Sequence, residues 1–228
     1  MDWIARLTEL TDDFAAELAE GDLGAAVPSC PGWTLADLGE HLRKVHLWAA
    51  HAVSDGKPDG MPDATTAARP AMTAEELVEG YPAAAAHLVE VLSAAAPEDA
   101  AWTFGPEQKA GFWRRRQVHE ALVHLYDAML ANGTAALWDP EPELAWDGVD
   151  EVATLFYPRQ VRLDRTSALV RPLRLTATDV DRSLTLGEGD DPIELALPAA
   201  DLLLALWKRE PVADADAAAL LTAAAVTP

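Results

Sequence analysis

Glu120 and His124 are the two side chains of this sequence whose types and spacing best suit metal chemistry. They lie four positions apart on a predicted helix, so both project from one face of it. Imidazole nitrogens and carboxylate oxygens bind zinc at about 2.0–2.2 Å, and a catalytic zinc site has a third protein ligand and one open position. The same spacing also fits an ordinary surface pair, because an apolar stripe that includes Val118, Leu122 and Leu125 lies nearly opposite.

Three histidines on an earlier predicted helix, His41, His46 and His51, are candidates for the third ligand. At about 100° per residue, His41 lies within the apolar stripe of that helix and points toward the core. His46 lies at the edge of the stripe, and His51 points away from it. A buried histidine needs a polar partner, and a metal shared with Glu120 and His124 would provide one.

Four helices are predicted to position these side chains. Apolar residues recur at steps of three and four, and Thr34 with Asp37 resembles a capping box at the start of the second helix. Four helices joined in sequence indicate an up-and-down bundle. The loops 54–72 and 97–111, which contain proline and glycine, are expected to shape a pocket. The predicted helices cover residues 2–20, 34–53, 73–95 and 112–132.

The pattern changes in the last third of the chain. A short helix is predicted to end at Pro158, after which apolar and polar residues alternate with the period of a strand. The sequence therefore predicts a mainly α protein with a bundle domain over residues 1–159 and a small α+β domain over 160–228. The elements expected after the bundle are a helix over 147–158, strands over 169–178, 183–186 and 193–197, and helices over 198–207 and 214–225.

The composition limits the partners of this chain. Its 228 residues carry 17 Lys and Arg against 38 Asp and Glu, a net charge of −21, which repels phosphate backbones and anionic membrane surfaces. No apolar stretch reaches the ~20 residues that span a bilayer, the N-terminus lacks a signal-peptide pattern, and the single Cys30 excludes an internal disulfide. We therefore expect a cytoplasmic monomer or homodimer that binds small molecules and neither nucleic acid nor membranes.

Several segments resemble a known family. Residues 27–42, the run 114–124 with Asp127, and the segment 199–209 look like the mycothiol-dependent maleylpyruvate isomerase family. The resemblance extends over nearly the whole chain. It implies a DinB-like metal-binding four-helix bundle with a small C-terminal domain. It also implies a zinc ion, or another divalent metal, and mycothiol as the thiol cosubstrate.

The resemblance further implies roles for particular residues. In that family one His from the second helix and a Glu-x-x-x-His pair from the fourth bind the zinc, and these positions are His41, Glu120 and His124 here. The catalytic arginine of the family lies in the C-terminal domain, where Arg209 is the nearest match in context and Arg182 is a rival. Arg209 also fits a cation that stabilises a helix C-terminus.

Other side chains are candidates for contact with the thiol or its substrate. Arg116 is the basic residue closest to the face of Glu120, and it could attract an anionic substrate. Trp48 is expected to pack in the core or, alternatively, to line the pocket, and Arg116 and Trp48 are the candidate cofactor-binding residues. Cys30 has no basic partner near it in sequence, so an inert packing role is expected.

A thiol bound to zinc suggests the reaction. A free thiol with a pKa of about 8.5 is mostly protonated at neutral pH, and zinc favours the nucleophilic thiolate. The predicted function is addition of the thiol to, or its transfer onto, a small electrophile, as in an isomerase or an S-transferase. The alternatives are a metal- or ligand-binding protein without catalysis and a metal-dependent hydrolase that uses zinc-bound water.

Overall fold

The structure is a computed structural model, and it describes residues 1–57 and 72–227. Two compact units make up the chain, Met1–Trp138 and Asp139–Pro228. Among the described residues, no helix is both long and apolar enough to cross a lipid bilayer. Most of the predicted loop 54–72 lies outside the described residues.

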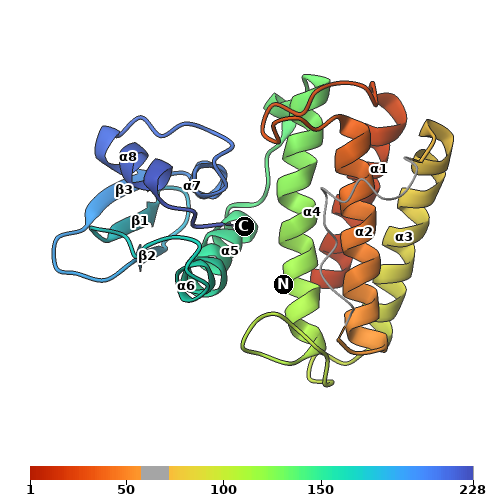
Figure 1. The fold of residues 1–228 in the computed structure, drawn as a ribbon, viewed down its shortest axis with the longest axis horizontal. Helices are drawn as coiled ribbons and strands as arrows, with labels where there is room; N and C mark the ends of the chain where they lie inside the picture. Colours follow the sequence, from red (N-terminus) through yellow and green to blue (C-terminus); the bar gives the residue numbers. More distant parts are fainter. Residues whose placement is uncertain (58–71, 228) are drawn as a thin grey trace. The chain divides into compact units, whose positions relative to one another are not determined.

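The first unit is a four-helix bundle, as predicted (Figure 1). α1 and α2 each pack mainly on α3 and α4, so the four helices surround one core. A short 3₁₀ turn over Ala135–Leu137 follows the bundle. The helices are α1 (Trp3–Glu20), α2 (Leu35–Ser54), α3 (Ala74–Ala94) and α4 (Ala110–Asn132).

The helices of the bundle do not alternate in direction throughout. Figure 1 shows α1 and α4 running one way and α2 and α3 running the opposite way. Residues 55–73 separate α2 from α3, and a connection of that length can span the ~30 Å of a 20-residue helix. Two consecutive helices can therefore lie parallel. The predicted bundle is confirmed, whereas the strict alternation of its helices is not.

Capping residues set where these helices begin and end. Thr34 and Asp37 form the capping box of α2: the Thr34 amide donates to the Asp37 carboxylate at 2.9 Å, and the Asp37 amide donates to Thr34 Oγ1 at 3.3 Å. Thr73 and Glu76 make the same pair of hydrogen bonds at the start of α3. Gly133 ends α4 with φ 77°, a conformation in which glycine has no Cβ clash.

α4 is buried on nearly all sides, and this decides between the two interpretations of its pattern. Arg116, Gln117, His124 and Asp127 are buried together with the apolar residues of the helix. The side chain of Glu120 is only 16% exposed. The alternative of an exposed surface pair is therefore wrong, because the polar side of this helix lies inside the protein.

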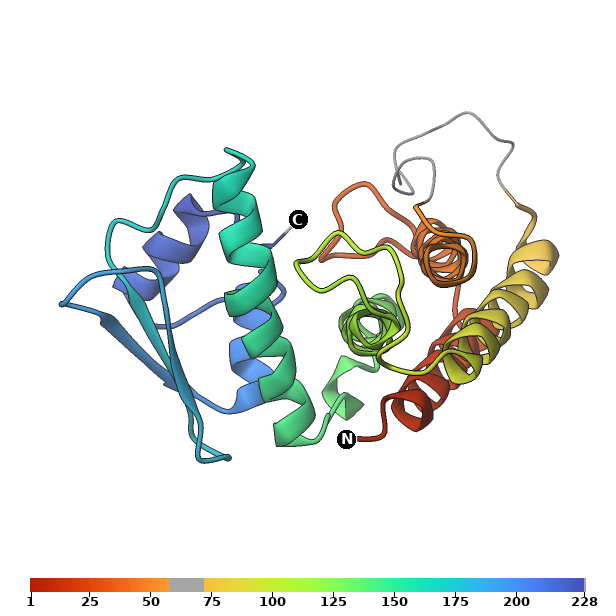
Figure 2. The same cartoon turned by 90° about the horizontal axis from the view of Figure 1, so that it is seen from below.

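A long helical segment with one wide turn opens the second unit. α5 (Pro142–Glu151), a π-helical turn (Val152–Phe156) and α6 (Tyr157–Arg162) follow one another as one continuous helix (Figure 2). The predicted end at Pro158 is wrong. Proline lacks an N–H and clashes with the carbonyl of the preceding turn in a regular helix, and the wider π turn before Pro158 relieves both constraints.

This helical segment also decides where the two units divide. α5 packs against α7 (Ala199–Leu206), so residues 139–159 share contacts with the C-terminal part of the chain. The division therefore lies before the boundary at 159/160 that the sequence pattern suggests. The sequence pattern puts the boundary between the two units near the first strand, whereas the contacts between residues put it before α5.

A small sheet confirms the α+β character of the second unit. β1 is the middle strand; it pairs antiparallel with β2 and parallel with β3. Leu173, Leu175 and Ala177 alternate along β1 as buried residues and contribute the core side of the sheet. α8 packs on β3. The elements are β1 (Leu173–Ala177), β2 (Ser183–Leu186), β3 (Ile193–Leu197) and α8 (Ala215–Ala223).

The helix α7 ends in the left-handed conformation without a glycine. Lys208 has φ 58°. Its amide donates to the Ala205 carbonyl at 3.0 Å, and the Arg209 amide donates to the Leu204 carbonyl at 2.8 Å. This is the Schellman pattern, in which glycine is the preferred residue at the position of Lys208.

We expect Lys208→Gly to raise the free energy of unfolding by about 1 kcal/mol. A residue other than glycine costs roughly 1–2 kcal/mol in this region, part of which is offset because glycine is freer in the unfolded chain. Urea unfolding measures the change. Gly133→Ala is the matched reverse. Gly133 has φ 77° and an added Cβ would meet nothing within 4 Å, so only the backbone strain changes, and the free energy of unfolding should fall by a similar amount. A Lys208→Gly protein no more stable than the parent would refute the expectation.

Candidate metal centre

Three potential metal ligands from α2 and α4 converge in the first unit. His41, Glu120 and His124 each offer one ligand atom, and these atoms lie within 4.8 Å of one another. His41 Nε2 lies 3.5 Å from Glu120 Oε1, and His124 Nε2 lies 3.4 Å from the same oxygen. The structure thus brings together the three residues that the sequence and its resemblance single out.

The spacing of these atoms fits one ion. Two ligands at about 2.1 Å from a tetrahedral ion are ~3.4 Å apart, which matches both nitrogen–oxygen distances. The side chains of His41, Glu120 and His124 are 17%, 16% and 10% exposed, so the position between them is shielded but reachable. In the described part of the chain, His41 Nδ1 is buried without a hydrogen-bond partner. The polar interactions of this ring therefore lie at Nε2, where the other two ligands are.

Arg116 keeps the carboxylate of Glu120 charged. Its Nη2 donates to Glu120 Oε2 from one turn earlier on α4, and its side chain is only 3% exposed. Burial alone would raise the pKa of Glu120, but the Arg116 guanidinium and the two histidines hold this pKa well below its usual range. Oε2 is occupied in this way, and Oε1 faces both imidazoles. The predicted contact of Arg116 with a cofactor stays a prediction.

Asp127 orients the ring of His124. His124 Nδ1 donates to Asp127 Oδ2 at 2.8 Å, and Asp127 is fully buried. Burial alone would lower the pKa of His124, but the hydrogen bonds and charges of Asp127 and Glu120 outweigh it and raise the pKa to about 9. A ring that donates through Nδ1 presents Nε2 to an ion. The sequence pattern assigns Asp127 no role, although its spacing of three from His124 on a helix is a signal for this contact.

His46 belongs to a separate buried network. It is fully buried, whereas the helical stripe predicts it at an edge. His46 Nδ1 donates to Gln117 Oε1 at 2.8 Å, and the Tyr81 hydroxyl lies 3.3 Å from Nε2. Burial lowers the pKa of His46 to about 4. His51, in contrast, is exposed, as predicted, and lies beside Asp55.

We expect His46 to make the protein less stable in mild acid. The unfolded chain binds a proton at this residue with the ordinary pKa of 6.5, whereas the folded protein binds it only near pH 4. The free energy of unfolding therefore falls as the pH drops from about 6.5 to 4, by about 2 kcal/mol between pH 7 and 5. His46→Gln keeps an amide donor but cannot titrate, so urea unfolding should show that this part of the pH dependence is lost. His51→Gln should keep it, and identical pH profiles for His46→Gln and the parent would rule this account out.

Trp48 packs in an aromatic cluster. Its ring meets that of Trp113 edge-on with centroids 4.9 Å apart, and it also contacts Trp102 and Phe104 from the loop before α4. Trp113 is fully buried, and its Nε1 donates to the Trp102 carbonyl at 2.6 Å. The packing role of Trp48 accounts for these contacts, and a contact with a cofactor stays a prediction.

The arginine expected to be catalytic lies in the second unit, in the turn after α7. Arg209 Nη1 donates to the Trp207 carbonyl at 2.8 Å, and its guanidinium lies 5.8 Å from the centroid of the Trp207 ring. Arg209 lines a cavity of about 400 Å³. The rival Arg182 is more than half exposed and lies 3.6 Å from Glu143. A catalytic role for Arg209 stays a prediction.

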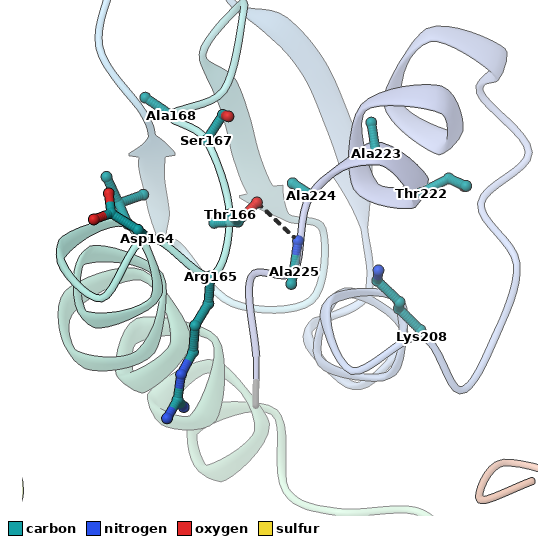
Figure 3. A pocket seen from close by; sticks show the side chains of 11 residues that line it. Asp164, Arg165, Thr166, Ser167, Ala168, Lys208, Thr222, Ala223, Ala224 and Ala225 are labelled. Atoms are coloured by element: carbon teal, nitrogen blue, oxygen red, sulfur yellow. Dashed lines mark hydrogen bonds between the residues drawn. The ribbon is translucent and has the colours of Figure 1, made fainter.

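A larger cavity of about 810 Å³ lies in the second unit, between the turn after α6 and residues 222–225 (Figure 3). The Ala225 amide donates to Thr166 Oγ1 at 3.1 Å and links its two sides. In Figure 3 the side chains of Asp164 and Arg165 extend away from residues 222–225. Lys208, the third charged lining residue, lies on the other side, so among the described residues these charged side chains do not converge as those of the metal centre do.

Comparisons with known proteins identify one matching family and two similar solved structures. Residues 4–129, which include all three converging ligands, match the family described as the mycothiol maleylpyruvate isomerase N-terminal domain. The fold is similar to a crystal structure of mycothiol-dependent maleylpyruvate isomerase, with a TM-score of 0.70 and 13% identity over 92% of this chain and 89% of that chain. A mutant of that isomerase gives a TM-score of 0.68 and 12% identity over 89% of this chain and 86% of that chain. No curated protein sequence matches the chain.

Proposed function

Because this chain is an enzyme that belongs to the mycothiol maleylpyruvate isomerase N-terminal domain family, we propose that it holds one divalent metal with His41, Glu120 and His124 and uses it to activate mycothiol. The observation that carries the proposal is the convergence of three ligand atoms from two helices within 4.8 Å of one another, with both imidazole nitrogens 3.4–3.5 Å from the same carboxylate oxygen. Zinc is the metal we propose, since two imidazoles and one carboxylate form a common zinc donor set with one open position.

Neighbouring residues orient two of the three ligands so that one coordination position of the metal would stay open. When bound, a divalent metal favours the thiolate form of a thiol beside it. Arg116 keeps Glu120 ionised and engaged through Oε2, so that Oε1 is available. Asp127 holds Nδ1 of His124, so that Nε2 is directed to the same place. The partial exposure of His41 leaves an approach for a small molecule.

The proposed reaction is addition of the mycothiol sulfur to a small electrophile. In an isomerase the thiolate adds to one carbon of a cis double bond, and the electron pair moves onto a conjugated carbonyl as an enolate. Rotation about the new single bond and expulsion of the thiolate then give the trans product. In an S-transferase the enolate carbon takes up a proton, or the thiolate displaces a halide ion from the substrate carbon, and the thioether is released. Arg209 is our candidate for the cation that binds the substrate carboxylate and stabilises the enolate.

We also infer a cytoplasmic enzyme that acts on small molecules, as a monomer or homodimer. The net charge of −21 supports this choice of partner, because it repels nucleic acid and anionic lipid surfaces. The single cysteine supports a reducing compartment.

Mass spectrometry of the zinc-loaded full chain, incubated with mycothiol and a panel of electrophiles, tests the proposal. The panel includes maleylpyruvate, for which chromatography before the mass spectrometer should show an isomer of unchanged mass at a new retention time, and alkyl halides, for which a thioether is expected. Both products should need zinc and mycothiol together. Turnover of any substrate with zinc alone would favour a hydrolase, and zinc binding without turnover across the panel would favour a binding protein; either result overturns thiol activation.

A further inference from the structure

The turn that precedes α2, over residues 27–33, reaches the outer side of the metal centre. Ser29 Oγ donates to Asp127 Oδ1 at 2.5 Å, and Cys30 Sγ donates to Asp127 Oδ2 at 3.7 Å. The same Oδ2 accepts from Nδ1 of His124 at 2.8 Å. This fully buried carboxylate therefore joins the turn to one of the proposed ligands.

The same turn contacts the other histidine. The ring of Trp33 packs against that of His41, with centroids 5.0 Å apart and planes at 56°. The turn is bonded to itself as well: the Val27 amide donates to the Trp33 carbonyl at 2.9 Å, and the Trp33 amide donates to the Cys30 carbonyl at 3.0 Å. One hydrogen-bonded turn therefore contacts His41 directly and reaches His124 through Asp127.

We propose that this turn positions the two histidine ligands, with Ser29 acting through Asp127 on His124 and Trp33 acting directly on His41. The inference rests on the proposed function, because it presupposes the metal. Ser29 is a positioning residue: by binding Oδ1 it keeps Oδ2 of Asp127 aimed at Nδ1 of His124, which fixes the tautomer and the direction of the ring. Outer partners of this kind change metal affinity by about 10–100-fold when they are removed.

A plain structural role is the competing explanation, because the Ser29–Asp127 bond also fastens the turn to α4. The two explanations differ in what they predict for the protein without metal. A fastening bond stabilises the metal-free fold and affects Zn²⁺ only through unfolding. A positioning bond changes the affinity for Zn²⁺ while the metal-free protein stays folded.

The test measures the affinity of the full metal-free chain for Zn²⁺ by competition with a chelator. We expect Ser29→Ala to bind Zn²⁺ about 10-fold more weakly and Ser29→Thr, which keeps the hydroxyl, to bind almost as tightly as the parent. Cys30→Ala removes the weaker donor and should give a smaller loss. Ser93→Ala is the matched control, because Ser93 is exposed and donates to the Val89 carbonyl of its own helix at 2.6 Å; its affinity should not change.

A double-mutant cycle tests whether Ser29 acts through Asp127, while the stability of the metal-free variants separates positioning from fastening. In an Asp127→Ala background the Ser29→Ala substitution should cause no further loss of Zn²⁺ affinity, because the carboxylate that it positions is gone. The visible spectrum of the Co²⁺-loaded protein should shift in Ser29→Ala and not in Ser93→Ala.

Three results would overturn the positioning role. They are unchanged Zn²⁺ affinity in Ser29→Ala, equal losses in both backgrounds of the cycle, and a loss fully explained by unfolding of the metal-free variant. A parent protein that binds no Zn²⁺ would overturn the proposed function as well. Loss of Zn²⁺ binding in the parent would overturn both proposals, whereas unchanged binding in Ser29→Ala would overturn only the positioning role.

Discussion

Replacing His41 or His124 with alanine is expected to remove both the metal and the activity. Each substitution deletes an imidazole nitrogen that lies 3.4–3.5 Å from Glu120 Oε1. Removal of an outer partner lowers metal affinity by about 10–100-fold, and removal of a ligand should exceed that range. Metal analysis and mycothiol-dependent turnover, measured on the same purified sample, check the result.

His51→Ala is the matched control for His41→Ala, because both residues lie on α2. The side chain of His51 is 49% exposed and lies 3.4 Å from Asp55. This variant should keep the metal content and turnover of the parent. If His41→Ala keeps its full metal content, the assignment of the ligands is wrong.

The second large effect is expected for Arg116→Met, which should lower the free energy of unfolding of the metal-free protein by about 3 kcal/mol. Methionine keeps an unbranched apolar side chain but removes the cation that neutralises Glu120. Breaking a buried ion pair from one side costs about 3–5 kcal/mol, and the partial exposure of Glu120 places the effect at the lower end. Urea unfolding measures the loss, and the pKa of Glu120 should rise because burial is then less opposed.

Arg6→Met is the matched control for this variant. Arg6 donates to Glu9 at 2.9 Å on the surface of α1, where the two side chains are 31% and 61% exposed. Exposed pairs of this kind contribute about 0–1 kcal/mol. A loss in Arg116→Met no larger than that in Arg6→Met would show that the pair with Glu120 does not matter for the fold.

The shared face of Glu120 and His124 was predictable, because residues four apart on a helix are neighbours. The burial of that face was not. A hydrophobic stripe marks the core-facing side of a helix only when the polar residues face water, and α4 also buries Arg116 and Asp127. Arg116 neutralises Glu120 and Asp127 accepts from His124. A pattern of apolar residues along one helix does not reveal such buried partners.

The bounds of α1 to α4 agree with the sequence because capping residues such as Thr34 and Thr73 mark them. Features that depend on distant partners were missed. His46 is buried because Gln117 and Tyr81, 71 and 35 positions away, satisfy its ring nitrogens. Pro158 continues a helix because a π turn precedes it. The loop between α2 and α3 was predicted from its proline and glycine residues, but a loop of that length is compatible with either a parallel or an antiparallel pair.

X-ray absorption at the zinc edge, on the full chain loaded with one equivalent of Zn²⁺, tests the existence of the metal centre most directly. We expect scattering from two imidazole rings, with nitrogens at about 2.0–2.1 Å, and from one carboxylate oxygen at about 2.0–2.2 Å. These donors correspond to His41, His124 and Glu120. A zinc without imidazole scattering, or one bound by the sulfur of Cys30, would contradict this assignment.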